Sequence, residues 1–499
     1  MKYRHFLSLP LAALLLASVG CGGGSPAADT TAASGGDTTT APVTELAPDL
    51  PAYDGGGADF TILAKMETNE TGRWTAQDVW VEDQNGEVIN DAVWKRNRTL
   101  EDKYNIVIKR EFMPISGQYS YNMFNELTRI IMAGDDAYDI VMPTIQDAAL
   151  LARDGMLYDL RENGNVDLSM PWWSQMFDEE TALDGKSYYA NGDICMSFIR
   201  ASYCMLFNKS LIEDYKLEDP YELVEKGEWT MDKVLELSEA FATDTNGDGE
   251  YTSADNVGLG VLNNHVEVFF TSAGCKFVEY DGNELTFVAD KERTINVLEN
   301  ILKLYTDEKN VLCFTKRERV ADEHIAAGVG HVEWAAGAFE SGKLMILAGT
   351  MNNVPSMRNM DADFGILPYP KYNEEQDSYY TYVQTWASGC AAIPVTADEN
   401  ASSIILEDMA YYSSKTIMPA YYETALKTKY ARDDESQAML DLLCDTRTVD
   451  IGNLYNVGKL VSTLTTNINN GEGNFVSLMA GLKSTIEGEL EEINEAYNK

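Results

Sequence analysis

The sequence predicts an α/β fold, because short apolar strands alternate with amphipathic helices over its first folded part. The predicted strands are residues 60–64, 106–108 and 139–142, and the predicted helices are residues 90–104, 123–132 and 146–153. This alternation favours mainly parallel sheets that are covered by helices. A length of 499 residues gives room for two large lobes, at roughly 100 to 200 residues per domain.

The individual elements carry local start and stop signals. Asn90 is a good helix cap, and Val93, Leu100 and Tyr104 recur on one face of the helix that follows. Glycine, which is favoured just after a helix, follows the helices at 123–132 and 146–153. Apolar residues recur every three or four positions from residue 475 to residue 497, which predicts a long amphipathic closing helix.

Residues 364–394 are the most distinctive stretch of the chain. Phe364 to Leu367 form a predicted buried strand that Pro368 ends, because proline cannot donate to a sheet ladder. The segment 379–386 then holds four aromatic residues, and an apolar run closed by Pro394 follows. Aromatic residues between two folded halves are typical of a crossover beside a sugar site, since flat rings stack on the C–H faces of sugars.

The chain is strongly acidic, with 80 Asp and Glu against 38 Lys and Arg and a formal net charge of -42. Such a surface repels phosphate backbones and anionic lipid headgroups. We therefore expect no nucleic-acid partner and no direct binding to a membrane surface.

The first residues predict export and lipid anchoring. Lys2 and Arg4 precede an apolar run at 7–17, which is too short for a permanent membrane span. Gly20 before Cys21 matches the bacterial lipoprotein pattern, although Ser18 stands where leucine is usual. We predict a signal peptide over residues 1–21 with a lipidated Cys21, which places the chain on the extracellular face of the cell membrane. Ordinary signal cleavage is the alternative.

A disordered tether is predicted over residues 22–57. This segment consists mainly of Gly, Ala, Thr, Ser, Asp and Pro and has few large apolar residues. Such a composition does not bury enough surface to offset the entropy lost on ordering.

Cysteine and histidine usage gives little support to catalysis. Six cysteines follow Cys21 at scattered spacings, so we expect buried thiols, with one disulfide left open. The four histidines show no HExxH spacing, and neither a GxSxG elbow nor a phosphate-binding loop is present. We predict that the protein is not an enzyme. A polysaccharide hydrolase remains the alternative, because paired carboxylates are easily found among so many acids.

The segment 244–255, DTNGDGEYTSAD, has the spacing of a calcium loop. Oxygen donors fall at positions 1, 3, 5, 7, 9 and 12, and Gly249 at position 6 permits the sharp bend. The predicted ligands are Asp244, Asn246, Asp248, Glu250, Thr252 and Asp255. We expect a structural calcium ion, with a solvated turn as the alternative, because position 12 is Asp and not the usual Glu.

Eight segments, taken in chain order, resemble the extracellular solute-binding proteins of family 1, the lipid-anchored carbohydrate receptors of ABC importers. They cover nearly all of the mature chain. The segments are residues 90–106, 137–160, 171–173 (PWW), 204–211 (CMLFNKSL), 228–259, 339–347 (FESGKLMIL), 364–376 (FGILPYPKYNEEQ) and 421–436.

This resemblance implies a two-lobed, type II periplasmic-binding-protein-like fold, with lobes joined by hinge crossovers. The implied division places residues 58–204 and 388–415 in lobe 1, and residues 205–387 and 416–499 in lobe 2. It further implies a monomer that captures a sugar or oligosaccharide between the lobes. The implied partners are two transmembrane permease subunits and, behind them, a cytoplasmic ATPase.

Candidate ligand-binding residues are those near predicted crossovers and strand ends that carry flat rings or planar polar groups. By position they resemble the residues that line the family's cleft. They are Thr144, Gln146, Asp147, Trp173, Arg200, Met351, Asn352, Tyr382 and Trp386. Core packing is the alternative for each aromatic residue, and an ion pair is the alternative for Arg200. The sequence leaves open which solute binds, and a peptide or a polyamine in place of a sugar is an alternative. It also leaves open whether the partner is a permease or a signalling sensor.

Overall fold

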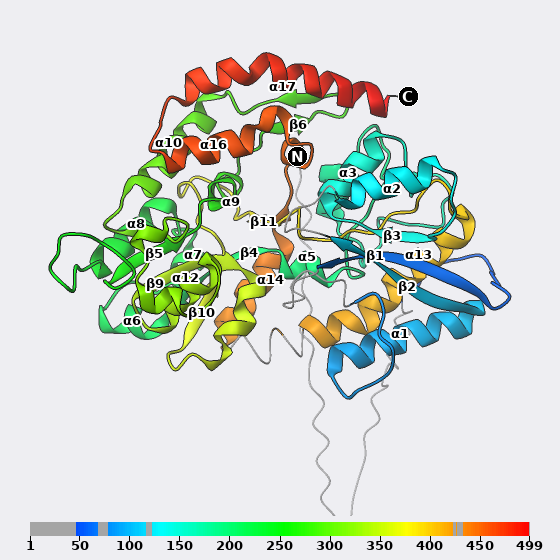
Figure 1. The fold of residues 1–499 in the computed structure, drawn as a ribbon, viewed down its shortest axis with the longest axis horizontal. Helices are drawn as coiled ribbons and strands as arrows, with labels where there is room; N and C mark the ends of the chain where they lie inside the picture. The colour runs from blue at the N-terminus through cyan, green and yellow to red at the C-terminus, as the bar shows by residue number, and fades with distance from the viewer. Residues whose placement is uncertain (1–45, 68–77, 116–121, 423–425, 427–432, 499) are drawn as a thin grey trace, which may run out of the picture. The chain divides into compact units, whose positions relative to one another are not determined.

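A computed structural model describes residues 46–67, 78–115, 122–422, 426 and 433–498. The described residues from Ala47 onward form one compact unit that contains two main sheets. Figure 1 shows that helices flank both sheets. The predicted signal peptide, Cys21 and residues 22–45 of the predicted tether lie outside the described residues. The end of the predicted tether is not disordered, which corrects its bound at residue 57: Tyr53 packs on Tyr104, and the Gly55 N–H donates to the Tyr104 carbonyl at 2.7 Å.

The first sheet has the strand order β2-β1-β3 and is entirely parallel. Its strands are β1 (Ala58–Glu67), β2 (Ile106–Ile115) and β3 (Ile140–Met142). The helices between and around them are α1 (Val88–Tyr104), α2 (Asn122–Met132), α3 (Ile145–Arg153), α4 (Gln175–Thr181), α5 (Met196–Arg200) and α13 (Glu399–Lys415). The predicted alternation of strands and helices is confirmed here, and β1 and β2 are longer than predicted.

The second sheet has five strands in the order β10-β4-β9-β5-β8. Its strands are β4 (Tyr203–Asn208), β5 (Val257–Val261), β8 (Val311–Cys313), β9 (Leu344–Thr350) and β10 (Phe364–Leu367). This sheet is mixed, which corrects the expectation of a mainly parallel one: β4 runs antiparallel to both neighbours, while β5 runs parallel to β8 and β9. The reason is that β4 enters from α5, outside this sheet, and not through a βαβ unit.

The remaining elements lie around the second sheet or between the regions of the two main sheets. The helices are α6 (Lys209–Asp214), α7 (Pro220–Lys226), α8 (Met231–Phe241), α9 (His265–Ser272), α10 (Glu292–Thr306), α11 (Asp322–Ile325), α12 (His331–Glu340), α14 (Asp434–Asp445), α15 (Ile451–Leu454), α16 (Leu460–Asn469) and α17 (Phe475–Tyr497). Short 3-10 helices are η1 (Arg317–Arg319), η2 (Met351–Asn359) and η4 (Val457–Lys459). The pairs β6 (Val278–Tyr280) with β7 (Leu285–Phe287), and β11 (Thr381–Tyr382) with β12 (Arg447–Thr448), form two small sheets.

Three segments meet where the chain passes between the regions of the two main sheets. Ser202, just before β4, forms an antiparallel bridge with Val383, and β11 pairs in parallel with β12. Glu180 of α4 holds this junction, because its carboxylate accepts hydrogen bonds from Thr448 Oγ1 at 2.5 Å and the Val449 backbone N–H at 2.7 Å. Strands β4 and β11 therefore both lie where the chain passes between the regions of the two main sheets.

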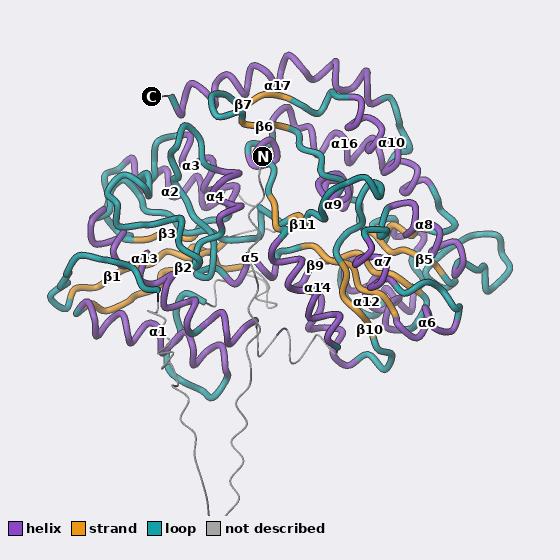
Figure 2. Tube along the Cα trace, turned by 180° about the vertical axis from the view of Figure 1, so that it is seen from behind, coloured by secondary structure: helices purple, strands orange, loops and turns teal. Residues whose placement is uncertain are grey.

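The predicted lobe boundaries remain predictions, but several contacts follow the predicted division. Residues 389–394 form bridges to Val141, Thr144, Leu157 and Ala190, on the side of the first sheet. Helix α14 packs on β10 of the second sheet. Helix α17 contacts both regions, since Tyr497 packs on Tyr188 while Asn494 binds the backbone of Leu285 (Figure 2).

The described cysteines are all free thiols, five of them buried, as the sequence led us to expect. Helices that have both the length and the apolar character needed to cross a membrane are absent from the part of the chain that the structure describes.

Candidate functional site

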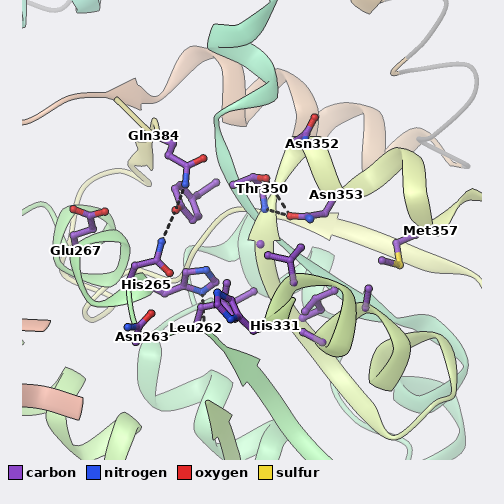
Figure 3. A pocket seen from close by; sticks show the side chains of 18 of the residues that line it. Leu262, Asn263, His265, Glu267, His331, Thr350, Asn352, Asn353, Met357 and Gln384 are labelled. Carbon is purple, nitrogen blue, oxygen red and sulfur yellow. Dashed lines mark hydrogen bonds between the residues drawn. The ribbon is translucent and has the colours of Figure 1, made fainter. Parts of the chain in front are cut away.

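A pocket of about 330 Å³ lies beside the junction of the crossing segments, over the second sheet (Figure 3). Its wall is formed by the start of β4, the turn after β5, the first turn of α9, helix α12, the end of β9, helix η2 and the segment after β11. The polar side chains that line it belong to Tyr203, Asn263, Asn264, His265, Glu267, His331, Thr350, Asn352, Asn353 and Gln384, and Trp386 adds an indole ring.

Two adjacent carboxamides follow β9 and are held in fixed orientations. Arg200 donates from Nε and Nη2 to Asn352 Oδ1, at 3.3 and 3.0 Å. The backbone N–H and the hydroxyl of Thr350 both donate to Asn353 Oδ1, at 2.8 and 3.1 Å. Since an arginine and a backbone N–H are donors only, these contacts fix which end of each amide is the oxygen.

The hydroxyl of Tyr203 organises the other side of the pocket. It accepts hydrogen bonds from Gln384 Nε2 at 3.1 Å and from Asn264 Nδ2 at 3.3 Å (Figure 3). Gln384 is only 6% exposed, and its Oε1 is buried without a hydrogen-bond partner. Among the described residues that line the pocket, Gln384 Oε1 is the one side-chain oxygen or nitrogen that is buried and has no hydrogen-bond partner.

His265 and Glu267 lie on the first turn of α9. The Leu262 backbone N–H donates to His265 Nδ1 at 3.4 Å, so the ring proton belongs on Nε2. Burial lowers the pKa of His265 to about 3, which keeps this imidazole neutral. Burial also raises the pKa of Glu267 to about 7, although the Tyr382 hydroxyl and Asn453 oppose this by hydrogen bonding.

Trp386 contributes the aromatic surface, and it is only partly buried. Its backbone carbonyl accepts from Lys65 Nζ at 3.2 Å, which ties the segment after β11 to the end of β1. A partly exposed indole among amides and hydroxyls provides the mixture of a flat apolar face and planar polar groups that carbohydrate binding uses.

Two of the nine residues predicted to bind ligand, Asn352 and Trp386, line this pocket. Arg200 lies directly behind Asn352 and contacts it. Met351 is 2% exposed, in the core, and the buried Tyr382 accepts from Asn453 Nδ2 at 2.5 Å through its hydroxyl.

The three predicted residues after β3 lie outside the pocket. Thr144 and Asp147 are fully buried and cap α3: Thr144 Oγ1 accepts from the Asp147 backbone N–H at 3.1 Å. Gln146, next to them, is half-buried, and its backbone N–H donates to Thr385 O at 3.4 Å. A helix cap at a strand end and a ligand contact look alike in sequence, since both favour Thr and Asp at that place.

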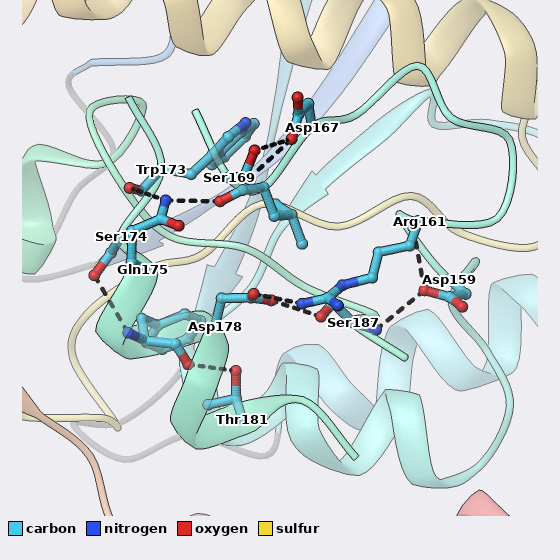
Figure 4. Close-up of polar contacts among 12 residues, drawn as sticks. Asp159, Arg161, Asp167, Ser169, Trp173, Ser174, Gln175, Asp178, Thr181 and Ser187 are labelled. Atoms are coloured by element: carbon cyan, nitrogen blue, oxygen red, sulfur yellow. Dashed lines mark hydrogen bonds and ion pairs between the residues drawn. The ribbon is translucent and has the colours of Figure 1, made fainter. Parts of the chain in front are cut away.

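Trp173 is also outside the pocket and is 3% exposed. Its indole N–H donates to Glu407 Oε2 at 2.8 Å, and that of Trp172 donates to Glu407 Oε1 at 3.0 Å. Figure 4 shows that the polar groups around it bind one another: Gln175 donates to the backbone of this segment, and Asp178 accepts from Arg161 and Ser187. The contacts support a structural role for this residue.

The acidic loop at 244–255 is closed by its own hydrogen bonds. Asp244 accepts from the backbone N–H groups of Gly247 and Gly249, at 2.6 and 2.9 Å, and Asp255 accepts from those of Thr245 and Thr252. Clusters of three or more His, Cys, Asp or Glu able to hold a metal are absent from the described residues. The oxygen-rich donor set suits calcium, but both Asp255 oxygens already bind N–H groups. Calcium binding by this loop therefore remains a prediction.

Sequence reasoning missed most of the pocket, although a signal for part of it was present. Asn263, Asn264 and His265 come directly after β5, and ligands of open α/β sheets bind at the carboxyl ends of strands. Gln384 lies two residues from Trp386, which the sequence did single out. His331 gave no such signal, because it enters the pocket at the start of α12 after a poorly patterned loop.

Comparison with known proteins gives matches in structure alone. No protein-family description matches the sequence, and no curated protein sequence does. The maltose-binding periplasmic protein of Listeria monocytogenes, solved with maltose, matches with a TM-score of 0.57 at 14% identity, over 87% of this chain and 98% of that one. An ABC substrate-binding protein of the same species, solved with cycloalternan, gives 0.52 at 12% identity over 89% and 99%.

A third match is a sugar transporter of Rhizobium etli in an open conformation, with a TM-score of 0.53 at 13% identity over 88% of this chain and 99% of that one. At sequence identities of 12 to 14%, these matches show a shared fold. The chain has the α/β fold of the two-lobed ABC substrate-binding proteins, as the sequence predicted.

Proposed function

We propose that this protein is the extracellular solute receptor of an ABC importer, and that it captures a sugar or oligosaccharide. The observation that carries the proposal is the pocket. It combines five carboxamides with one partly exposed tryptophan, beside the junction of the crossing segments, in the fold of substrate-binding proteins whose solved forms hold maltose and cycloalternan.

The proposed mechanism is ligand-driven closure at that junction. Gln384 and Trp386 line the pocket and directly follow β11, which pairs with β12 at the junction. A ligand that touches both lobes in the closed form, and one lobe in the open form, binds the closed form more tightly and shifts the population toward it. Only this difference in affinity drives the closure.

The pocket supports binding over hydrolysis. Glycoside hydrolysis uses two carboxyl groups about 5 to 10 Å apart on either side of the bond. Among the described residues that line the pocket, Glu267 is the one carboxylate. We therefore propose that the ligand is released unaltered to two transmembrane permease subunits, which a cytoplasmic ATPase drives.

Anchoring and localisation complete the proposal and rest on the sequence. Cys21 follows a short apolar run and Gly20. Lipidation of this residue would hold the monomer at the extracellular face of the membrane, with the segment from residue 22 to about residue 46 as its tether. Mass spectrometry of the N-terminal peptide from the native host tests this, since a diacylglyceryl group on Cys21 has a defined mass and an unmodified thiol contradicts the assignment.

Thermal-shift screening tests the ligand class. A ligand at 100 times its dissociation constant adds about 2.7 kcal/mol to the stability, so a binding sugar raises the melting temperature measurably. The panel contains neutral hexose and pentose oligomers, maltose and cycloalternan, uronate oligomers, peptides and polyamines. A shift with sugars, with the sugar recovered intact, supports the proposal. A shift with peptides or polyamines alone, or the recovery of cleaved sugar, overturns it.

A further inference from the structure

The two amides after β9 form a wall of hydrogen-bond donors. The oxygens of Asn352 and Asn353 are occupied by Arg200 and Thr350, so the amide nitrogens are the ends left for a ligand. No described residue accepts a hydrogen bond from either nitrogen. Gly349 permits this packing, because a Cβ at that position would come within 2.8 Å of Asn353 Oδ1. We call Asn352 and Asn353 the donor wall.

The opposite side has the reverse polarity. The Tyr203 hydroxyl accepts from the amide nitrogens of Gln384 and Asn264, which leaves the amide oxygens as the ligand-facing ends. Gln384 Oε1 is buried and without a partner, so it is an acceptor that a ligand hydroxyl can satisfy. Glu267, with its carboxylate, lies on the same side of the pocket (Figure 3). We call Gln384 and Asn264 the acceptor wall, because Glu267 already accepts from Asn453 Nδ2 at 3.1 Å.

The described part of the pocket offers an acidic ligand no side chain with a permanent positive charge. Neither Lys nor Arg is among the described residues that line it. Arg200 directs two of its N–H groups to Asn352, and Lys65 donates to the backbone of Trp386. His265 is buried and held by Leu262, and His331 lies at the exposed edge. A carboxylate that enters the pocket leaves water without gaining an opposite charge, which is costly.

We propose that this pocket selects a neutral polyhydroxylated ligand over its uronate counterpart, and that Arg200 is a positioning residue that turns the Asn352 amide toward the ligand. This inference rests on the proposed function and names its substrate class. Hydroxyl groups suit both walls, because each hydroxyl donates one hydrogen bond and accepts others.

Titration calorimetry of the full chain at about pH 7.5 with paired oligosaccharides tests the selectivity. The pairs are neutral hexose or pentose oligomers, maltose included, and uronate oligomers of equal length. We expect the neutral member to bind at least about tenfold more tightly, as for a charge that is desolvated without a partner. If the uronate binds equally tightly or more tightly, the proposed selectivity is wrong, but the proposed function as a sugar receptor still holds. If neither class binds, the proposed function falls, and this inference falls with it.

Variants test the positioning role of Arg200 with the tightest neutral binder. Asn352→Ala and Arg200→Met should each weaken binding about tenfold, the effect of one lost hydrogen bond in a closed site. The double variant should be no weaker than either single variant, because both remove the same donor. If the affinity losses of the two single variants add in the double variant, Arg200 does not act through Asn352. The positioning role is also overturned if Arg200→Met weakens binding only at temperatures where the variant is partly unfolded, as its lowered melting temperature would show.

A charge-matched pair controls for the effect of adding an acid. Asn352→Asp replaces the amide donor by an acceptor that Arg200 holds, so the neutral ligand should lose about tenfold or more in affinity. Asn283→Asp adds the same charge on an exposed turn outside the pocket and should leave affinity unchanged. Full affinity in Asn352→Asp contradicts the donor wall.

Discussion

Trp386 is the aromatic side chain that we expect to contribute most to ligand affinity. Its indole lies at the pocket and is only partly buried, beside amide groups that fix the direction of hydrogen bonds. Trp386→Ala should weaken sugar binding about 10- to 100-fold, because a tryptophan buries a large apolar area against its ligand. Calorimetry with the tightest sugar of the panel measures this.

Trp94→Ala is the matched control for that experiment. Trp94 lies on α1, where Arg98 packs over its ring at 5.9 Å, and it is not among the pocket residues. Its removal should leave the affinity unchanged. If Trp386→Ala and Trp94→Ala bind the sugar with the same affinity, the pocket is not the sugar site.

For Trp173 we expect the opposite result, which is a loss of stability without a loss of sugar affinity. Its indole N–H is bound to Glu407 inside the core, so Trp173→Phe should lower the free energy of unfolding by about 1 to 3 kcal/mol. Sugar affinity should stay the same. Denaturant unfolding measures the stability of the variant, and calorimetry measures its sugar affinity. A loss of affinity at unchanged stability would show that Trp173 contacts the ligand.

These residues show what the sequence can and cannot predict about a site. Trp386 and Asn352 were predicted because they follow a crossover and a strand end, and both line the pocket. Thr144 and Asp147 satisfied the same rule, yet their side chains serve as a helix cap. The difference lies in burial and in hydrogen-bond partners that are distant in sequence, and a local pattern contains neither.

Among the elements, the loop at 244–255 carries a separate prediction. If its oxygen donors bind calcium, as its spacing predicts, adding about 1 mM calcium should raise the melting temperature and a chelator should lower it, because a ligand of the native state stabilises that state. Asp248→Ala should abolish this response, since Asp248 is an exposed predicted ligand. A response that is absent, or that survives in Asp248→Ala, leaves the loop as a turn closed by its own hydrogen bonds.

Element bounds were predictable where periodicity and end signals coincided. The predicted closing helix is α17 at the same bounds, Phe475–Tyr497, and the predicted strand at Phe364–Leu367 is β10. Strand direction in the second sheet was not predictable from alternation alone. It depends on where the chain enters the sheet, and β4 enters through a crossover and runs against both neighbours.

At the scale of the whole molecule, four buried carboxyl groups contribute to the pH dependence of stability and outnumber the buried His265, whose lowered pKa acts in the opposite direction. Burial raises the pKa of Glu267, Glu407, Asp450 and Asp193 to about 7 each. The ordinary pKa is 4.5 for an exposed Glu and 3.8 for an exposed Asp. Between those values and about 7, the native state therefore binds more protons than the unfolded state does.

The sign of the pH effect follows from this proton balance. When the native state binds more protons, the free energy of unfolding falls as pH rises. The contribution of these four groups is fully present below about pH 4 and is lost as pH rises through about 7. We expect the melting temperature to decrease from about pH 5 to about pH 8, which scanning fluorimetry over that range measures.

Two controls separate this effect from the repulsion among surface charges, which the net charge of -42 makes large. Salt at about 0.5 M screens exposed charges much more than buried ones, so the decrease with pH should persist. Glu407→Gln should reduce the slope, because it removes one buried group that titrates. Glu399→Gln, in the half-buried first turn of the same helix, should not. A melting temperature that rises over this pH range would show that the buried carboxylates are ionised in the native state and stabilised by their N–H donors.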